Sequence, residues 1–352
     1  MKILKYFFFL LLIVIIGGAI YFATQDGSFD VAVNKTINAA PQVVYNNVKD
    51  FKNWQAWGPW VEEDPDIQIA YAEKTAGEGA SYSWKSDKMG DGGMKTIKVI
   101  PNKEIDQTIS FNTPMGDSES EVYWRFKGTE TPGQTQVTWG MKGERSLVEK
   151  VFMSFQKEDF EMQLRVMYAK GLDNLKATVE NEIKKYSVNV DGVSQHGGGF
   201  YMYVTAASRM DGIATKMGGM FGQVSGYMAQ NNIDATGMPF TIYNTIDAAN
   251  NTVIFSTAIP VRERVIIPEG SPVVCGFMEP PVAVKVTLKG NYNNLDKAYA
   301  AGMQYVAENN LEVGPTAKMF EVYRNDPGEV PNPAHWLTEV YIPIIPNTPT
   351  QQ

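Results

Sequence analysis

Tyr227-Met228-Ala229-Gln230-Asn231-Asn232-Ile233 returns 78 positions later as Tyr305-Val306-Ala307-Glu308-Asn309-Asn310-Leu311, and this echo decides the fold of the C-terminal half. Two further pairs follow in the same order: Phe240-Thr241-Ile242-Tyr243 with Phe320-Glu321-Val322-Tyr323, and Ile259-Pro260-Val261 with Ile342-Pro343-Ile344. Because order and spacing are both kept, the chain contains a duplicated unit of about 80 residues. We expect the two copies to face each other across a pseudo-two-fold axis, with a cleft between similar walls.

Hydrophobic periodicity gives both copies the same elements, namely strand, helix, strand and strand. In the first copy, a strand opens at Phe200, a helix covers about 211–230, and a strand pair lies around 238–261. In the second copy, we expect a strand at 282–288, a helix at 295–310, and strands at 317–324 and 336–344. The pattern therefore predicts an α+β domain over residues 200–346.

One carboxylate breaks the symmetry of the echo. Aligning the two Ile-Pro pairs places Ser256 opposite Glu339, so an acidic group stands on one wall of the cleft only. Successive residues of a strand point to opposite faces of the sheet. If Val340 and Ile342 face the core, Glu339 and its neighbour Tyr341 face the cleft.

By the same alternation, Tyr323 and Tyr243 point away from the apolar residues beside them. We therefore expect one ligand site lined by Glu339, Tyr341, Tyr323 and Tyr243, with Trp336 either capping it or merely starting the strand. A carboxylate ringed by tyrosines suits an organic cation, through Coulomb attraction and cation–π contacts. If desolvated, it could also act as a general acid or base. The competing interpretations are an exposed strand carboxylate and ordinary half-buried strand tyrosines.

The segments Tyr323-Arg324-Asn325-Asp326-Pro327 and Thr338-Glu339-Val340-Tyr341-Ile342-Pro343-Ile344 closely resemble the gyrase-inhibitor-like small-molecule-binding domain. This domain is also the effector-binding domain of AraC- and MerR-type regulators. The resemblance implies a groove for bulky, often cationic or amphipathic molecules, with a glutamate of the last strand, here Glu339, pointing into it. Some members of that family hydrolyse small electrophilic compounds. The regulators carry a helix-turn-helix segment, which does not precede the domain in this chain.

The preceding part of the chain has a different pattern. An alternating strand at 31–37 leads to a helix start at Pro41, then to Asn53-Trp54-Gln55-Ala56-Trp57-Gly58-Pro59-Trp60. Five or six strands follow between 67 and 140, and a long helix carries apolar residues at steps of three and four from Leu164 to Ile183. This order resembles the START-like, polyketide-cyclase superfamily (SRPBCC) over residues 29–186. It implies a curved sheet around the long helix, with the tryptophans either packing the core or lining an apolar cavity.

The N-terminus carries an apolar run. Residues 6–23 are uncharged and follow Lys2 and Lys5. As a helix the run would be about 27 Å long, close to the ~30 Å hydrocarbon core of a bilayer. We interpret it as an uncleaved signal anchor, the alternative being a cleaved signal peptide. The flanking charges favour a cytoplasmic N-terminus and C-terminal domains outside the cytoplasm.

Composition narrows the classes of partner. A formal net charge of −8 and a pI near 5.0, with no basic stripe, argue against nucleic acid as a partner. The single Cys275 cannot form an internal disulfide. His335 has no His, Cys or carboxylate at metal-ligand spacing, and no phosphate-binding or nucleophile motif occurs. We therefore expect neither a metal nor a cofactor.

These patterns combine into an α+β chain with a transmembrane helix, a START-like helix-grip domain and a duplicated effector-binding domain. The expected divisions are an anchor and linker at 1–28, the START-like domain at 29–186, a linker at 187–199, the effector-binding domain at 200–346 and a tail at 347–352. The expected function is membrane-anchored binding of an amphipathic or cationic organic ligand, in a groove centred on Glu339. The alternatives are a hydrolase in which Glu339 and a tyrosine act as acid and base, and a protein-interaction module.

Overall fold

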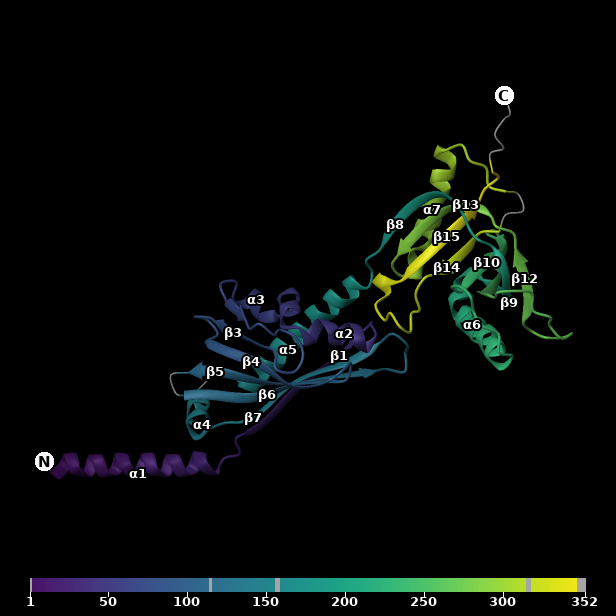
Figure 1. Ribbon diagram of the computed structural model, residues 1–352. Coiled ribbons are helices and arrows are strands. Elements are labelled where there is room, and N and C mark those ends of the chain that lie inside the picture. The colour runs from purple at the N-terminus through teal and green to yellow at the C-terminus, as the bar shows by residue number, and fades with distance from the viewer. Residues whose placement is uncertain (1, 114–115, 156–158, 315–317, 347–352) are drawn as a thin grey trace. The chain divides into compact units, whose positions relative to one another are not determined.

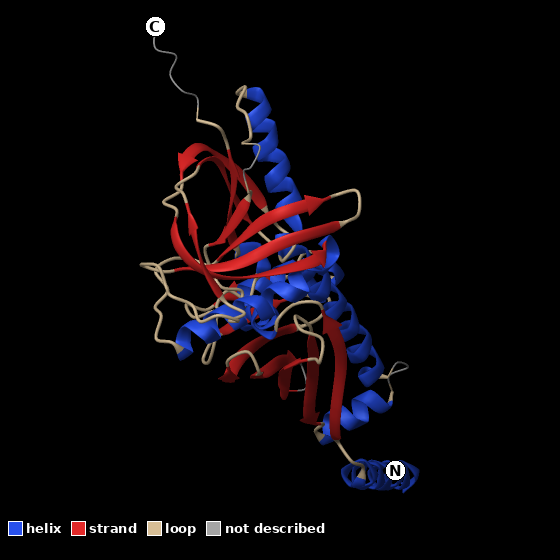
Figure 2. Cartoon of the chain, turned by 90° about the vertical axis from the view of Figure 1, so that its right-hand side faces the viewer, coloured by secondary structure: helices blue, strands red, loops and turns tan. Residues whose placement is uncertain are grey.

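A computed structural model describes residues 2–113, 116–155, 159–314 and 318–346 of the chain. They form two compact units, Met1–Glu182 and Ile183–Gln352 (Figure 1). Each unit contains one antiparallel sheet with helices packed on it, as the secondary-structure colouring of Figure 2 shows. The predicted tail at 347–352 lies outside the described residues.

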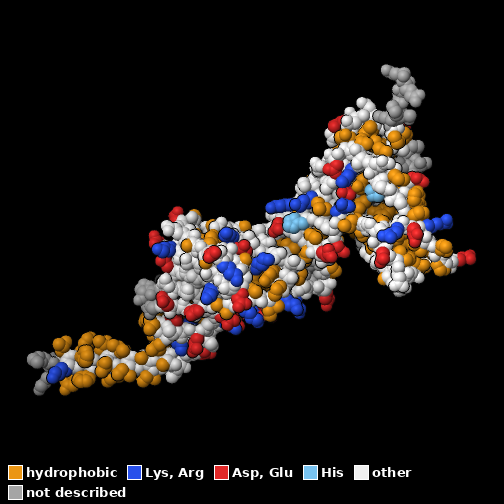
Figure 3. Space-filling view, viewed as in Figure 1, with side chains coloured by type: hydrophobic (Ala, Val, Ile, Leu, Met, Phe, Trp, Pro, Cys, Tyr) orange, Lys and Arg blue, Asp and Glu red, His pale blue; other side chains and the backbone are white. Residues whose placement is uncertain are grey.

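The first unit begins with helix α1 (Lys2–Thr24). Its segment Leu4–Thr24 has a mean hydropathy of 2.5, and none of it is buried inside the protein. Figure 3 shows apolar side chains along the helix. By length and composition alone, α1 could cross a membrane or serve as a signal sequence.

A seven-stranded sheet in the order β1-β7-β6-β5-β4-β3-β2 forms the body of the first unit. Between 67 and 140 the sequence predicts five or six strands, and the structure contains six strands that begin there, joined in sequence as a meander. The strands are β1 (Ser28–Ile37), β2 (Gln68–Tyr71), β3 (Ser81–Lys85), β4 (Asp91–Ile100), β5 (Glu104–Thr113), β6 (Gly116–Gly128) and β7 (Thr135–Glu144). The helical elements are α2 (Pro41–Lys49), η1 (Phe51–Ala56), α3 (Pro59–Glu63), α4 (Leu147–Ser154) and α5 (Phe160–Glu182).

Helix α5 packs its apolar stripe against the sheet. Leu164, Tyr168 and Leu172 are buried at steps of four residues. Gly171 permits this close approach, because a Cβ there would lie 2.6 Å from the Trp139 ring. Four tryptophans fill the core beside α5, namely Trp54, Trp57, Trp124 and Trp139. The predicted apolar face of the long helix is therefore the face that closes over the sheet.

The second unit holds an eight-stranded sheet in the order β12-β9-β11-β10-β14-β15-β13-β8. Its strands are β8 (Ser187–Gln195), β9 (Gly199–Arg209), β10 (Phe240–Asp247), β11 (Thr252–Pro260), β12 (Val274–Met278), β13 (Val282–Lys289), β14 (Phe320–Tyr323) and β15 (Leu337–Pro343). Its helices are α6 (Ile213–Gln230) and α7 (Leu295–Glu308), with short turns η2 (Met210–Gly212), η3 (Tyr292–Asn294) and η4 (Pro333–His335). Each echoed stretch thus supplies a strand, a helix and two further strands.

The Asn-Asn pairs of the echo end the two helices. Asn232 and Asn310 adopt left-handed backbone angles, with φ of 54° and 51°. The amide of the next residue then bonds back into the helix, from Ile233 to the Met228 carbonyl and from Leu311 to the Val306 carbonyl, each at 2.9 Å. Asparagine tolerates this conformation and an apolar residue follows it, which is how helices commonly end. The echo is therefore a repeated helix stop.

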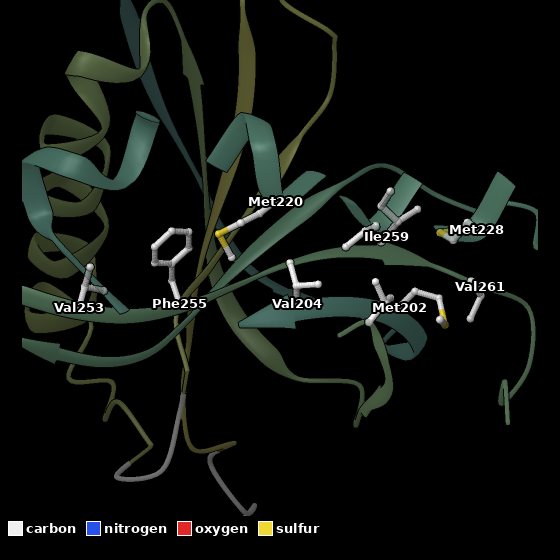
Figure 4. Packing of buried hydrophobic residues seen from close by; sticks show 10 residues of the cluster. Met202, Val204, Met220, Met228, Val253, Phe255, Ile259 and Val261 are labelled. Carbon is white, nitrogen blue, oxygen red and sulfur yellow. The ribbon is translucent and has the colours of Figure 1, made fainter. Parts of the chain in front are cut away.

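Both helices pack on the same face of the sheet. The α6 core includes Met220, Val204 and Phe255 (Figure 4). Residues paired across neighbouring strands share a face of the sheet, and so do residues two apart on one strand. Phe255 pairs with Tyr243, which shares its face with Thr241 on β10. Thr241 pairs with Glu321, and Glu321 pairs with Val340, which packs against α7. Thr241 and Glu321 therefore lie on the helix side of the two central strands.

The predicted linker at 187–199 is wrong for most of its length, because residues 187–195 form the edge strand β8. Val188 and Val190 pack against the α7 core. The Asp191-Gly192 pair that indicated a break is a β-bulge, since the pairing with β13 skips Asp191 and Gly192 has a φ of 90°. Glycine accepts this angle at low cost, so the strand continues through it.

Candidate functional site

The first unit contains a cavity of about 830 Å³ between the sheet and α5, open to solvent on one side. Aromatic and aliphatic side chains predominate in its wall. The lining residues are Trp60, Glu63, Ile67, Tyr82, Trp84, Met89, Met94, Ile109, Phe111, Trp139, Met141, Asp159, Phe160, Met162, Gln163, Leu164, Val166, Met167 and Tyr168. Sites for small molecules are typically concave, mostly apolar and roughly 300–1,000 Å³ in volume. This cavity has those properties.

The cavity wall contains two buried phenols. Burial raises the pKa of both Tyr82 and Tyr168, so both hydroxyls stay protonated at neutral pH. The acids Glu63 and Asp159 are exposed rather than buried in the wall. An uncharged apolar body with few polar atoms is the ligand chemistry that such a wall accommodates.

The open side of the cavity lies along the first turns of α5. Met162 and Val166 line the cavity while being 59% and 62% exposed to solvent. Five methionines contribute to the wall, and their flexible thioethers adapt to differently shaped ligands. They are Met89, Met94, Met141, Met162 and Met167.

The second unit holds a buried carboxylate between its two repeated stretches. Glu321 of β14 is 1% exposed and pairs with Thr241 of β10 on the helix side of the sheet. Three phenol hydroxyls donate to it: Tyr243 and Tyr299 to Oε1, at 2.9 and 3.0 Å, and Tyr323 to Oε2 at 2.9 Å. Among the described residues, no lysine or arginine forms an ion pair with it.

The pKa values of this cluster follow from its burial. Burial raises the pKa of the Glu321 carboxyl above its usual value, and the three phenol donors offset part of that rise by stabilising the carboxylate. Burial, together with the nearby Glu321, also raises the pKa of Tyr243, Tyr299 and Tyr323. The tyrosines are therefore donors and Glu321 is the acceptor. An uncompensated carboxylate in this setting attracts a positive charge.

Further aromatic rings extend this cluster toward Trp336. The ring of Tyr323 lies 5.5 Å from Tyr292, and Tyr292 lies 4.7 Å from Trp336. On the other side, Phe221 of α6 contacts Tyr323 edge-on at 5.8 Å. Trp336 is held by a 2.7 Å bond from its indole N–H to the Val330 carbonyl. Of the five predicted site residues, Tyr243 and Tyr323 contact Glu321, and Trp336 connects to them through Tyr292.

The remaining two predicted residues lie on the opposite face of the sheet, so the expectation of one shared cleft is wrong. Glu339 pairs with Val322, and Tyr341 pairs with Phe320. Phe320 and Val322 alternate with Glu321 and so face away from the helices. Alternation along the sequence predicts a core face for each strand separately. The apolar residues of β14 and those of β15, however, are buried on different sides.

Glu339 is already compensated by basic side chains. Its carboxylate lies 2.8 Å from the Lys285 ammonium and 3.6 Å from the Arg324 guanidinium, and it accepts a 3.0 Å bond from Tyr341. Burial and the adjacent carboxylate raise the pKa of Tyr341. The equivalent residue of the first repeat, Ser256, bonds with Thr205 at 2.8 Å. Glu339 thus has cationic partners within the protein, whereas Glu321 has none that the structure describes.

Glu321 and Tyr299 are the residues that the sequence argument missed. The signal for Glu321 lies in the echo itself, where Phe240-Thr241-Ile242-Tyr243 becomes Phe320-Glu321-Val322-Tyr323. Thr241 and Glu321 differ in charge at equivalent places, as do Ser256 and Glu339. Tyr299 has no such signal, since its role depends on the placement of α7 over β14. Among the described residues, no group of three or more His, Cys, Asp or Glu could hold a metal.

Comparison with known families supports the START-like prediction for the first unit. Residues 28–180 match a family model described as polyketide cyclase/dehydrase and lipid transport. The match ends before the second unit begins. No curated protein matches the sequence.

Several solved structures resemble parts of the chain at low identity. The EcmrR C-terminal domain is 16% identical, with 46% of this chain and 98% of that chain covered and a TM-score of 0.40. Protein MLL2253 from Mesorhizobium loti is 15% identical, with coverage of 44% and 98% and a TM-score of 0.32. The Aha1 dimer from Colwellia psychrerythraea is 21% identical, with coverage of 43% and 96% and a TM-score of 0.31.

Proposed function

We propose that this chain is a membrane-anchored small-molecule-binding protein whose first unit holds an apolar molecule. The observation that carries the proposal is the cavity of about 830 Å³ between the sheet and α5. The family description, which includes lipid transport, agrees with a ligand of this kind. Helix α1 supplies the anchor in this proposal, and its length and apolar composition support that role.

Native mass spectrometry of the full-length protein, purified from its own membrane in detergent, tests the proposal. A bound apolar molecule of constant mass, retained after detergent exchange, is the expected result. A second measurement uses N-phenyl-1-naphthylamine, an uncharged apolar fluorophore, and follows energy transfer from the cavity tryptophans. Absence of both a carried molecule and saturable energy transfer would refute ligand binding in this cavity.

A second candidate function is recognition of an organic cation by the second unit, as an effector-binding domain whose duplicated part covers residues 200–346 and whose sheet also includes β8. The observation that favours it is Glu321, a buried carboxylate with three tyrosine donors and no basic partner that the structure describes. We propose Glu321, Tyr243, Tyr299 and Tyr323 as the recognition residues, with Trp336 nearby. Ring faces add about 0.5–2 kcal/mol each to cation binding. Glu339 and Tyr341 are less suited to binding a cation, because Glu339 already forms ion pairs with Lys285 and Arg324.

Titration of the full-length protein with tetraphenylphosphonium, a bulky lipophilic cation, tests this second function. Saturable quenching of protein fluorescence is expected. Tetraphenylmethane, an uncharged molecule of similar size and shape, should cause no saturable quenching. Equal responses to the two probes would argue for unspecific partition. An assay of the same samples for hydrolysis of small electrophilic esters tests the enzymatic alternative. That alternative requires turnover that is lost when Glu339 or Glu321 is replaced.

The proposed topology has the N-terminus in the cytoplasm and both units outside it. Lys2 and Lys5 before the helix, with Asp26 and Asp30 after it, support this direction. Protease added to intact cells should digest the C-terminal domains. Full protection of those domains, with digestion only after lysis, would reverse the proposed orientation.

A further inference from the structure

Helix α4 leaves its apolar side chains uncovered. A capping box starts the helix, with Ser146 accepting from the Glu149 amide and the Glu149 side chain accepting from the Ser146 amide. None of its residues is buried in the protein. Four large apolar side chains on α4 and just after it are exposed: Leu147 (42%), Val148 (51%), Phe152 (47%) and Phe155 (81%). Such a concentration of exposed apolar area marks an interaction surface.

The chain leaving α1 holds α4 close to the end of that helix. Only residues 25–27 separate Thr24, the last residue of α1, from strand β1. Two of these three residues bond to the α4 region: the Lys150 ammonium donates to the Gln25 carbonyl at 2.6 Å, and the Arg145 amide donates to the Gly27 carbonyl at 2.9 Å. If α1 spans a bilayer, Gln25 lies at the membrane interface. The bonds therefore hold α4 at the same level, whatever the tilt of α1.

The start of α5, which forms the open side of the cavity, is fixed to the same region. Phe160 contacts Phe29 edge-on at 5.8 Å, and the Arg145 guanidinium bonds to Glu161 at 2.9 Å. Phe29 is five residues after Thr24 and so lies within about 18 Å of it along the chain. The exposed cavity residues Met162 and Val166 follow in the next two turns. The mouth of the cavity is thus held near the C-terminal end of α1, which is where the chain would leave a bilayer that α1 spans.

We propose that α4 and the first two turns of α5 dock on the surface of the bilayer that α1 crosses, and that the cavity receives its apolar ligand from that bilayer. This inference rests on the proposed membrane anchoring and ligand binding. The occupant of the apolar surface is lipid because the covalent tether places the surface at the interface. A short helix with apolar residues on its outer side is suited to the boundary between headgroups and acyl chains. A ligand that enters there need not cross water.

Depth-dependent quenching of a site-specific probe tests the docking. The full-length protein carrying Cys275→Ser receives one new cysteine, Phe152→Cys or, as a control, Ile97→Cys, each labelled with the fluorophore NBD. Ile97 is a matched control because it is exposed to a similar degree, 49% against 47%, but lies on β4. In phosphatidylcholine/phosphatidylglycerol vesicles containing acyl-chain nitroxide lipid, the label at 152 should be quenched at least threefold more than the label at 97.

The two labels distinguish the possible occupants of the surface. Equal quenching by nitroxide lipid overturns the proposal. So does a label at 152 that is shielded from aqueous iodide yet unaffected by nitroxide lipid, because a protein partner or second copy then covers the surface. Neither result depends on whether the cavity holds a ligand, so failure here is distinct from failure of the proposed function.

Uptake kinetics test the route of entry. N-phenyl-1-naphthylamine is presented in the same vesicles, and energy transfer from tryptophan reports its arrival in the cavity. Phe152 does not line the cavity. Phe152→Glu should therefore slow uptake from vesicles at least threefold, with the final level of energy transfer unchanged, while Ile97→Glu should change neither. An unchanged uptake rate for Phe152→Glu in protein that retains its circular dichroism spectrum overturns entry from the bilayer.

Discussion

Thr241 and Glu321 are paired across the two central strands of the second sheet and occupy equivalent places in the repeated sequence. A neutral hydroxyl thus faces a carboxylate where two otherwise similar halves meet. Tyr323 bonds to both of them, at 3.1 Å to Thr241 and 2.9 Å to Glu321. The asymmetry places one buried carboxyl group beside three protonated phenols, and the cation recognition proposed for the second unit rests on the charge of that group.

Removal of the Glu321 charge should weaken the cation recognition proposed for the second unit. In Glu321→Gln the side chain keeps its size but loses the Coulomb attraction, so tetraphenylphosphonium affinity should fall at least about tenfold, equivalent to about 1.4 kcal/mol. Fluorescence titration of the full-length protein measures the change. Glu339→Gln is the matched control, since its carboxylate belongs to an ion pair on the other face, and its affinity should stay within about threefold of wild type. The opposite ranking of the two variants would restore Glu339 as the recognition residue.

The raised pKa of Glu321 predicts how stability depends on pH. An acid whose pKa is higher in the folded state binds more protons folded than unfolded, so the free energy of unfolding falls as pH rises through that interval. The interval begins near the usual value of 4.5 and ends at the raised pKa of the folded state. Glu321→Gln lacks this titration, so its stability relative to wild type should increase with pH across the interval and then level off. Calorimetry between pH 4 and pH 8 measures the difference in the free energy of unfolding between the variant and wild type. A difference that stays constant over this range would mean that the Glu321 pKa is not raised.

Filling the cavity of the first unit should block its ligand without unfolding the protein. Ile109 lies on β5 in the cavity wall. Ile109→Trp projects a larger ring into open space, so N-phenyl-1-naphthylamine affinity should fall at least about tenfold, with the thermal transition within a few degrees of wild type. The control Ile97→Trp adds the same ring outside the cavity and should bind like wild type. Unimpaired binding by Ile109→Trp would locate the probe elsewhere.

The left-handed end of α7 predicts an asymmetric response to two small substitutions. Asn310 has a φ of 51°, which alanine adopts at a cost of about 1 kcal/mol and glycine adopts freely. Asn310→Ala should therefore lower the free energy of unfolding by about 1 kcal/mol, whereas Asn310→Gly should leave it nearly unchanged. Denaturant titration followed by circular dichroism measures both. Equal effects would mean that the asparagine side chain, rather than the backbone angle, stabilises the helix end.

Local signals in the sequence predicted most elements of both sheets. The Asn-Asn-apolar stops fix where α6 and α7 end, and strand alternation locates β9, β13 and β15 to within a few residues. These features depend on the backbone conformation of a few adjacent residues. They can be read from the sequence because no distant contact is needed to produce them.

Local signals do not show whether the apolar residues of two neighbouring strands lie on the same face of the sheet. Alternation separates Phe320 from Glu321, and Val340 from Tyr341, on their own strands. Only the register, which pairs Phe320 with Tyr341, shows that the apolar sets lie on opposite sides. Register depends on how β14 meets β15 across a long connection. A sheet buried on both faces gives no hydrophobic signal to choose between the two arrangements.

Strand β8 has a consequence for dividing the chain into parts. It covers the outer side of β13 and pairs with it from Ser187 to Gln195. A fragment beginning at residue 200 would leave the free amide and carbonyl groups of β13 ready to recruit a strand from another molecule. Fragments of the second unit should therefore start no later than Ile183, and those that start at residue 200 should form oligomers or precipitate. The residues that look like a spacer are thus a strand of the second sheet, and they pair the backbone groups of β13 within the chain.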